Sequence, residues 1–432
     1  MQPDKDKSDM KKLLIIMLLP LAARGQTLRQ CQDAAGQNYP LIRQYDLIRQ
    51  TTQITVSNIS RAWWPQISAS AQASLQSDVT DWPQQMKALY EQMGIAMQGL
   101  RRDQYRIGID VSQTLYDGGA VRLRQEIARR QGDVDEADTE VTLYQVRRRV
   151  NEMYFALLLL DEQIRLNADL RQLLSGNEGK LASMHRQGTA AESDYLSVKA
   201  ERLKIEQQGA DLQAQRRMLC TLLSTFCGIQ VTAPQKPSVA GGGTPGLRPE
   251  LKAVGARLRL ADAQERSLRA SLRPRLSLFA QGYYGYPGLN LFRDMTRHEW
   301  TLNGIVGARL AWNIGALYTI KNDRAKIQMQ RDMAQNSRDV FLFNNNLQQV
   351  QQDENIARYR RLMEGDEEII ALRSAVRKAA ESKLAHGIID VNDLLKEINA
   401  ESSAQVEHTI HEIQMLKEIC DLKFTQNNDI SQ

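Results

Sequence analysis

The chain has 432 residues, of which 42% are hydrophobic and 25% charged, and this composition excludes an intrinsically disordered protein. Its mean hydropathy of -0.46 is low for a bundle of transmembrane helices. The formal net charge of +5 is small for this length, and basic residues are scattered among acidic ones, which favours solvated helix faces over a nucleic-acid surface.

No recognisable catalytic motif accompanies this composition. The sequence lacks a phosphate-binding Walker loop, the HExxH and CxxC metal or redox patterns, and the GxSxG nucleophile motif. Its five histidines are too few and too dispersed to suggest a metal cluster. We therefore expect a protein that is not an enzyme and that needs no cofactor and no metal.

The first predicted element is a secretory signal peptide, residues 1–25. The segment 11–25 has two lysines, an apolar run and then Ala23-Arg24-Gly25, which fits a signal peptidase site. The apolar run is too short to span a bilayer comfortably, and a buried core helix is the alternative. We expect translation to start at Met10 and the mature chain to begin at Gln26.

The four cysteines follow this segment. A secreted chain enters an oxidising compartment, where disulfides are permitted, and four cysteines allow three pairings that the sequence does not decide. Two of them lie about two turns apart on one predicted helix, too far to bond each other. We interpret all four as structural or free thiols: Cys31, Cys220, Cys227 and Cys420.

Recurrent landmarks indicate that the chain is internally duplicated. Pro40 and Pro65 are followed 209 positions later by Pro249 and Pro274. The sequence LYDGG (115–119) corresponds to AWNIG (311–315), and two glycine-containing bends centred on residues 188 and 387 lie 199 positions apart. Each half reads as helix, strand, loop, strand, very long helix, bend and long helix.

These landmarks predict the domain organisation. The first repeat takes residues 26–232, with a strand pair within 65–117 and a helical hairpin whose tip lies near residue 188. A Gly/Pro-rich linker, 233–248, joins it to the second repeat, 249–425, with strands within 274–313 and a tip near residue 387. A short tail, 426–432, completes the chain.

The four predicted strands alternate apolar and polar residues over about ten positions, as do the strands of membrane β-barrels. The strand 275–284 is less regular, because Phe279 and Tyr283 interrupt its polar face. A small sheet packed on helices is the alternative, but it would need an apolar helix face to cover it. Aromatic residues gather at or near the strand ends, where an interfacial girdle would lie, and five of them are predicted membrane-interface residues: Trp63, Trp64, Tyr105, Trp300 and Trp312.

Four strands cannot close a barrel, and an open edge in lipid leaves backbone groups unpaired. The barrel must then be shared between chains: two copies supply eight strands, and three supply twelve with room for a pore. Small polar residues on the inward face favour the trimer. The segment from residue 120 to the bend at 188 contains no proline, so we expect four long antiparallel helices per chain that continue the barrel as a tube.

With these features the chain resembles the TolC-like outer membrane efflux proteins, over residues 27–424. The resemblance rests on the signal peptide, the two halves, RPEL at 248–251, LYDGG at 115–119 and the paired bends. It implies a mixed α and β membrane protein: a trimer with a twelve-stranded barrel, four strands per chain, continued by a periplasmic α-helical barrel. It also implies a passive conduit in the cell outer membrane that works with a periplasmic adaptor and an inner-membrane RND or ABC-type pump.

The resemblance also implies functional residues at the bends. The adaptor-docking tips would be Arg186, Gln187, Gly188, Thr189, His386, Gly387 and Ile388. The pore constriction would hold Asp194, Asp393 and Lys396, where many relatives have a second aspartate in place of the lysine. Helix N-capping is the alternative role for the two aspartates. His386 is interpreted as a plain exposed tip residue, with a pH-sensing or metal role as the alternative.

Two further gate positions depart from the family pattern, because Leu384 and Ile389 stand where relatives often have an aromatic residue and an arginine. The exported substrate is not readable from the sequence. The alternative to a channel is a periplasmic coiled-coil scaffold without a pore. Detergent-requiring trimers in the outer membrane fraction would favour the channel, and release by salt would favour the scaffold.

Overall fold

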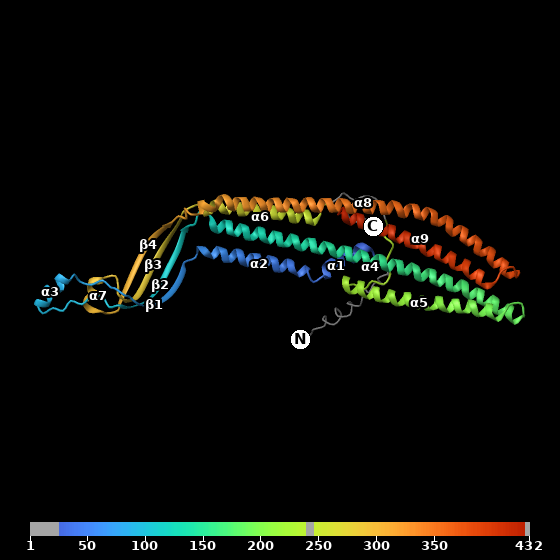
Figure 1. Ribbon diagram of the computed structural model, residues 1–432, viewed down its shortest axis with the longest axis horizontal. Helices are drawn as coiled ribbons and strands as arrows, with labels where there is room; N and C mark the ends of the chain where they lie inside the picture. Colours follow the sequence, from blue (N-terminus) through green and yellow to red (C-terminus); the bar gives the residue numbers. More distant parts are fainter. Residues whose placement is uncertain (1–25, 239–245, 428–432) are drawn as a thin grey trace, which may run out of the picture. The chain divides into compact units, whose positions relative to one another are not determined.

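The computed structural model describes residues 26–238 and 246–427 (Figure 1). The predicted signal peptide, part of the linker and most of the C-terminal tail lie outside these residues. Within them, no helix combines the length and the apolar character that crossing a membrane requires.

The order of elements agrees with the one expected for each half. After α1 (Leu28–Asn38), the first half holds α2 (Ile42–Ser60), a 3-10 turn (Arg61–Trp63), β1 (Gln66–Leu75), α3 (Gln84–Gln92), β2 (Asp103–Tyr116), α4 (Ala120–Arg186) and α5 (Glu192–Cys227). The second half holds α6 (Pro249–Ser271), β3 (Arg275–Tyr286), α7 (Leu291–Arg297), β4 (Thr301–Ala311), α8 (Ala316–Ala385) and α9 (Val391–Thr425). The short helices α3 and α7 stand in the loops between strands and were not expected.

The chain divides into two compact units that cut across the predicted repeats. Among the described residues, one unit comprises 26–42, 140–238, 246–248 and 341–427, and the other comprises 43–139 and 249–340. The unit of residues 43–139 and 249–340 contains all four strands and is called the sheet unit. The other unit contains the two helical bends and is called the hairpin unit. The long helices α4, of 67 residues, and α8, of 70 residues, each contribute to both units.

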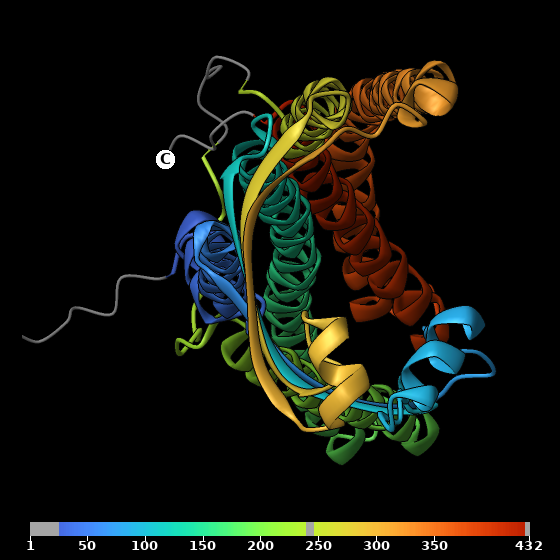
Figure 2. The same ribbon diagram turned by 90° about the vertical axis from the view of Figure 1, so that its left-hand side faces the viewer.

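The sheet unit contains one antiparallel sheet in the order β1-β2-β3-β4. Its register places the apolar residues of the four strands on one face, since Ala69 pairs with Ile109 and Ala280 pairs with both Val111 and Val306. Figure 2 shows the sheet as an arc with α7 on its concave side. Leu289, just before α7, donates its backbone N–H to Asn303 on the polar face at 2.8 Å, so the polar face is the concave one.

Within the part of the chain that the structure describes, the convex, apolar face is left uncovered. Ile67 is 71% exposed, Leu302 is 81% exposed and Val306 is 82% exposed. The alternative of a sheet packed under an apolar helix face is therefore wrong for this chain. Large exposed apolar surfaces of this kind mark contact with a membrane or another protein.

Two aromatic residues interrupt the concave face, and arginines cover both. The Arg106 guanidinium lies 4.0 Å from the ring centre of Tyr283, and that of Arg309 lies 5.0 Å from the ring centre of Phe279. Cation–π stacking of this kind keeps the charged edge of the guanidinium available to water. The concave face therefore stays polar despite the irregular alternation in β3.

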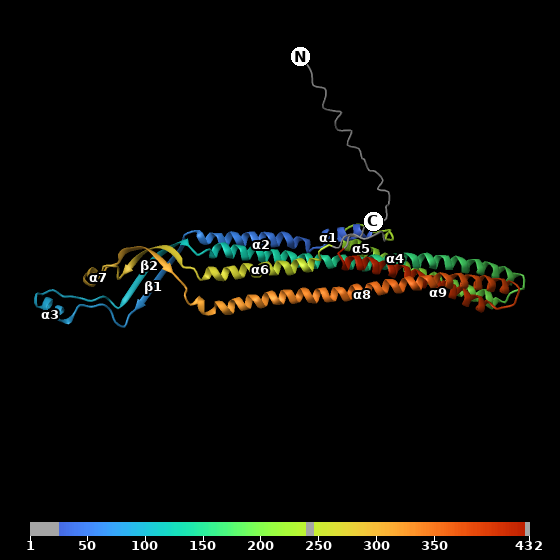
Figure 3. The same cartoon turned by 90° about the horizontal axis from the view of Figure 1, so that it is seen from above.

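The helices of the sheet unit follow one another in the order α2, α4, α6, α8, and Figure 3 shows them from above. Ion pairs join each neighbouring pair: Arg49 of α2 with Glu136 of α4 at 3.0 Å, Arg266 of α6 with Glu126 of α4 at 2.6 Å, and Arg331 of α8 with Glu265 of α6 at 2.7 Å. Gly132 leaves room for this packing, because an added Cβ would stand 2.4 Å from the Thr52 hydroxyl.

The hairpin unit has a hydrophobic core where α1, α4, α5 and α9 meet. Its largest fully buried side chains include Tyr154, Phe155 and Leu157 of α4, which pack against Leu28 of α1 and Leu223 of α5. The backbone N–H of Gln235 donates to the Tyr154 hydroxyl at 2.9 Å, which ties the start of the linker to this core.

Replacing Tyr154 by Phe should lower the free energy of unfolding by about 1 kcal/mol, because the part-buried hydrogen bonds of the hydroxyl to the backbone at Gln26 and Gln235 are lost. Burial of Tyr154 raises the pKa of its hydroxyl, so the group stays protonated across the physiological range. Tyr318→Phe is the control, since Tyr318 is 85% exposed. Equal denaturant midpoints for both variants would contradict the role of Tyr154.

Candidate pore and docking sites

The two predicted tips are matching helix ends. Gly188 and Gly387 adopt φ of +71° and +68°, the left-handed conformation that glycine adopts without strain. Thr189 donates its N–H to the Met184 carbonyl at 2.9 Å, and Ile388 donates to the Lys383 carbonyl at 2.9 Å. This hydrogen-bond pattern is the Schellman motif that ends many helices.

The predicted docking residues are all exposed: Arg186, Gln187, Gly188, Thr189, His386, Gly387 and Ile388. Ile388 is 69% exposed, so the second tip presents a bare aliphatic side chain to solvent. The Nδ1 atom of His386 lies 2.7 Å from the Ser382 carbonyl of the preceding turn. This local contact agrees with a plain exposed tip residue.

The aspartates do not cap their helices, contrary to the alternative raised from the sequence. The N-cap of α9 is Asp390, whose carboxylate accepts the backbone N–H of Asp393 at 2.8 Å, and the N-cap of α5 is Ala191, which has no side-chain acceptor. Asp194 and Asp393 instead lie in the first turns of their helices, where a negative charge interacts favourably with the helix dipole.

Asp393 and Lys396 lie together on the first turn of α9. Their side chains form an exposed ion pair with 3.2 Å between Nζ and Oδ1. Exposed pairs of this spacing contribute less than about 1 kcal/mol to stability, so the lysine chiefly offsets the local negative charge. Asp194 forms no ion pair within residues 26–238 and 246–427.

An apolar cluster packs the two hairpins together just behind the tips. The first hairpin contributes Leu174, Leu181, Val198 and Ile205, and the second contributes Ala380, Val391, Leu394 and Ile398. Leu384 and Ile389 pack against this cluster. Leu384 and Ile389 therefore have a packing role in this chain. In the sequence they were noted only as departures from the residues that relatives often have at the gate.

An ion pair joins the two helices of each hairpin, and the acidic and basic partners are exchanged between the two hairpins. The sequence analysis did not predict these pairs. In the first hairpin Glu178 of α4 pairs with Arg202 of α5 at 2.5 Å, and this carboxylate raises the pKa of the arginine. In the second hairpin, 199 positions later, Arg377 of α8 pairs with Glu401 of α9. A search for opposite charges at corresponding positions of the two halves could have found them.

Aromatic residues lie at both ends of the sheet. At the end beside α3 and α7, Trp300 stacks on Tyr105 with 5.9 Å between ring centres and meets Tyr284 at 5.4 Å. At the end beside the long helices lie Trp63, Trp64 and Trp312, the last donating its indole N–H to the Leu272 carbonyl at 2.9 Å. Tyr284 is an addition to the predicted set, and its place on the apolar face was readable from the alternation of β3.

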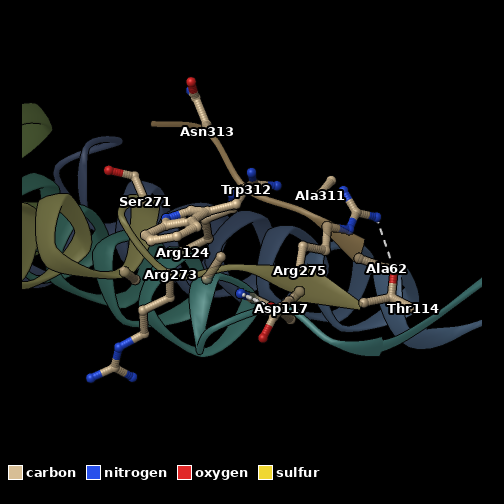
Figure 4. Close-up of a pocket in the computed structure, with 13 residues that line it drawn as sticks. Ala62, Thr114, Asp117, Arg124, Ser271, Arg273, Arg275, Ala311, Trp312 and Asn313 are labelled. Carbon is tan, nitrogen blue, oxygen red and sulfur yellow. Dashed lines mark hydrogen bonds between the residues drawn. The ribbon is translucent and has the colours of Figure 1, made fainter. Parts of the chain in front are cut away.

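A pocket of about 520 Å³ lies where the strands pass into the long helices (Figure 4). The Asp117 carboxylate accepts the backbone N–H of Gly119 at 2.8 Å and that of Val121 at 2.6 Å, so it caps α4. Arg275 donates to the Thr114 hydroxyl at 2.8 Å across neighbouring strands. The LYDGG sequence is therefore a structural exit turn, and Asn313 stands at the place of Asp117 in the second half.

Replacing Arg377 by Ala should destabilise the second hairpin by about 3–5 kcal/mol, because Glu401 then stays buried without its partner. The double exchange Arg377→Glu with Glu401→Arg should recover part of the loss, since it restores the charge order of the first hairpin. Hydrogen exchange of α8 and α9 measures both effects. The matched control is Arg338→Ala, which removes an exposed ion pair of the same helix. Equal hydrogen-exchange protection in Arg377→Ala, the double exchange and this control would refute the role of the Arg377–Glu401 pair.

Comparison with solved structures gives 23 matches. The outer-membrane channel OprN matches with a TM-score of 0.66 at 16% identity, over 93% of this chain and 90% of that chain. The outer membrane protein VceC of Vibrio cholerae matches with 0.64 at 13% identity, over 94% and 97%. The outer membrane channel CmeC of Campylobacter jejuni matches with 0.62 at 14% identity, over 94% and 87%.

No family model and no curated protein matches the sequence. The predicted resemblance is confirmed in the fold: this chain has the fold of the outer membrane efflux channels.

Proposed function

We propose that the chain is one protomer of an outer membrane export channel, a passive conduit for molecules delivered by an inner-membrane pump and a periplasmic adaptor. One observation carries the proposal: a curved sheet with an exposed apolar convex face and a polar concave face. Its outer strands β1 and β4 each pair on one side only within the described chain. Such a sheet needs lipid on its convex side and neighbouring copies at its edges.

Three copies are the proposed assembly. Twelve strands leave a lumen, whereas the interior of an eight-stranded barrel is filled by side chains. The middle of the concave face carries mainly small or polar side chains that suit a wet lumen, among them Ser68, Ser70, Gln72, Asp110 and Gln281. The two aromatic groups then lie at the two membrane interfaces, where amphipathic rings are favoured.

Exposed apolar residues on the outer helices of the sheet unit support the same assembly. Leu47 and Ile54 of α2 are both 60% exposed and stand seven positions apart, as do Met333 and Val340 of α8 at 68% and 51%. Seven-residue spacing of apolar side chains is typical of helices that pack against a partner helix. The helical tube would close through these faces. We also propose that the two halves are copies of one unit, with the repeat boundaries predicted from the sequence.

The paired bends form the periplasmic mouth in this proposal, with the exposed tip residues as the docking surface for the adaptor. Three copies would place rings of Asp194 and Asp393 near the constriction. A ring of carboxylates in a narrow lumen concentrates negative potential and favours cations. Lys396 beside Asp393 weakens that field. Solved structures with this fold are titled as outer membrane channels, among them MtrE in its open state, which supports the conduit.

Ala71→Arg should reduce the yield of folded trimer, whereas Ser70→Arg should not. The two residues are adjacent and exposed in the middle of β1, but Ala71 lies on the convex face and Ser70 on the concave one. An arginine facing mid-bilayer costs about 2–4 kcal/mol in a barrel strand. Outer membrane fractionation followed by electrophoresis with and without heating measures the assembly.

This pair also discriminates the channel from the periplasmic coiled-coil scaffold. In a scaffold both residues face water, so both variants should behave like the parent protein. Release of the parent protein by salt, without detergent, would likewise oppose the channel.

Asp393→Ala should lower the cation selectivity of the reconstituted channel, and Lys396→Ala should raise it. The two side chains form one ion pair, so each change exposes the charge of the other. Reversal potentials across a planar bilayer in a potassium chloride gradient measure both. Asp169→Ala is a control, because Asp169 is an exposed surface residue of α4. Reversal potentials that stay at the parent value in both variants would remove this turn from the constriction.

A further inference from the structure

The core of the hairpin unit contains two cysteines from distant parts of the chain. Cys31 lies on α1 and is fully buried, and Cys227 is the last residue of α5 and is 1% exposed. Both belong to the cluster that surrounds Tyr154. The structure holds all four cysteines as free thiols, and within the described residues no group of metal-binding side chains exists that could explain the pair.

Several contacts fix α1 against the end of α5. The Asn38 amide donates to the carbonyls of Thr225 and Phe226, both at 3.2 Å, and thereby satisfies the last turn of α5. Tyr39 packs on Phe226 with 5.8 Å between ring centres. Gly228 then turns the chain with φ of +69° directly beside Asn38. The two helices are therefore held in one arrangement by groups other than the sulfur atoms.

Within this arrangement the Cys31 and Cys227 thiols lie within hydrogen-bonding reach of each other. This contact raises the pKa of Cys31 and lowers that of Cys227. The other two cysteines differ. Burial raises the pKa of Cys420 to about 12, and Cys220 lies beside the Arg216 guanidinium at 3.7 Å, away from the pair.

We infer that Cys31 and Cys227 form a disulfide bond in the mature protein, and that this bond fastens α1 to the end of α5. The inference rests on the proposed function, because it needs the oxidising periplasm. The oxidant is a protein disulfide of the envelope thiol-oxidase class. One of the two thiols, as the thiolate, attacks it to form a mixed disulfide, and the other then attacks the sulfur of that cysteine and releases the oxidase as a dithiol.

Two protein thiols are thus oxidised while one oxidase disulfide is reduced, and the exchange leaves no net proton. The reaction precedes complete burial of α1, because neither sulfur is accessible in the folded chain. The bond closes a loop that contains the whole first half of the protein between residues 31 and 227. Such a long loop restricts the unfolded chain strongly, which favours the folded one. The second half has no corresponding pair.

The test uses full-length protein purified from the outer membrane and unfolded with an alkylating agent but no reductant. The expected result is two alkylated residues, Cys220 and Cys420, and a peptide pair joined through Cys31 and Cys227. Reductant should then lower the Tm of the wild type by a few degrees, on the order of that expected for losing one long-loop disulfide. It should leave the Tm of a Cys31→Ser/Cys227→Ser double variant unchanged.

Cys420→Ser is the matched control, because Cys420 is 2% exposed in the same core but forms no such pair. This variant should lose packing yet keep the response to reductant. Four alkylated cysteines in protein from the outer membrane would overturn the disulfide and leave the channel intact. Absence of the protein from that membrane, by contrast, would count against the proposed function itself.

Discussion

Backbone hydrogen bonding at the edges of a four-stranded sheet is the constraint on which this molecule depends. A sheet in water can leave its outer strands to the solvent, but a sheet whose convex face is apolar cannot keep its edges open beside lipid. In the proposed trimer the polar concave face would line the lumen, and the apolar side chains that α2 and α8 expose would meet neighbouring copies. One chain would then supply a third of the barrel wall.

The elements were largely predictable because their determinants are local. Pro40 and Pro249 lie at the start of α2 and α6, the helices that precede β1 and β3. Alternation marks the strand faces, and glycines at 188 and 387 end the long helices with a known hydrogen-bond pattern. Each of these signals needs only neighbours in the sequence. The alternation also predicted which face of the sheet would be apolar, and the register agrees with it in all four strands.

The parts that were not predictable depend on what lies opposite in space. Asp390, and not Asp393, caps α9, because the exit angle of the preceding turn decides which carboxylate meets the free amides. Leu384 and Ile389 looked like lost gate residues, yet they pack into the apolar cluster between the hairpins. The proximity of Cys31 and Cys227 likewise required knowing that α1 lies along the end of α5. The pore residues remain predictions, since a constriction forms only between copies.

The inverted ion pairs bear on how the chain avoids misfolding. The two hairpins have similar lengths and the same kind of turn. During folding, α4 could therefore pack against α9, and α8 against α5. That exchange would set Glu178 of α4 against Glu401 of α9, and Arg377 of α8 against Arg202 of α5. Both encounters would repel at positions that are partly buried, whereas both correct encounters attract. The opposite order of charges at equivalent positions thus favours the correct pairing of two otherwise similar hairpins during folding.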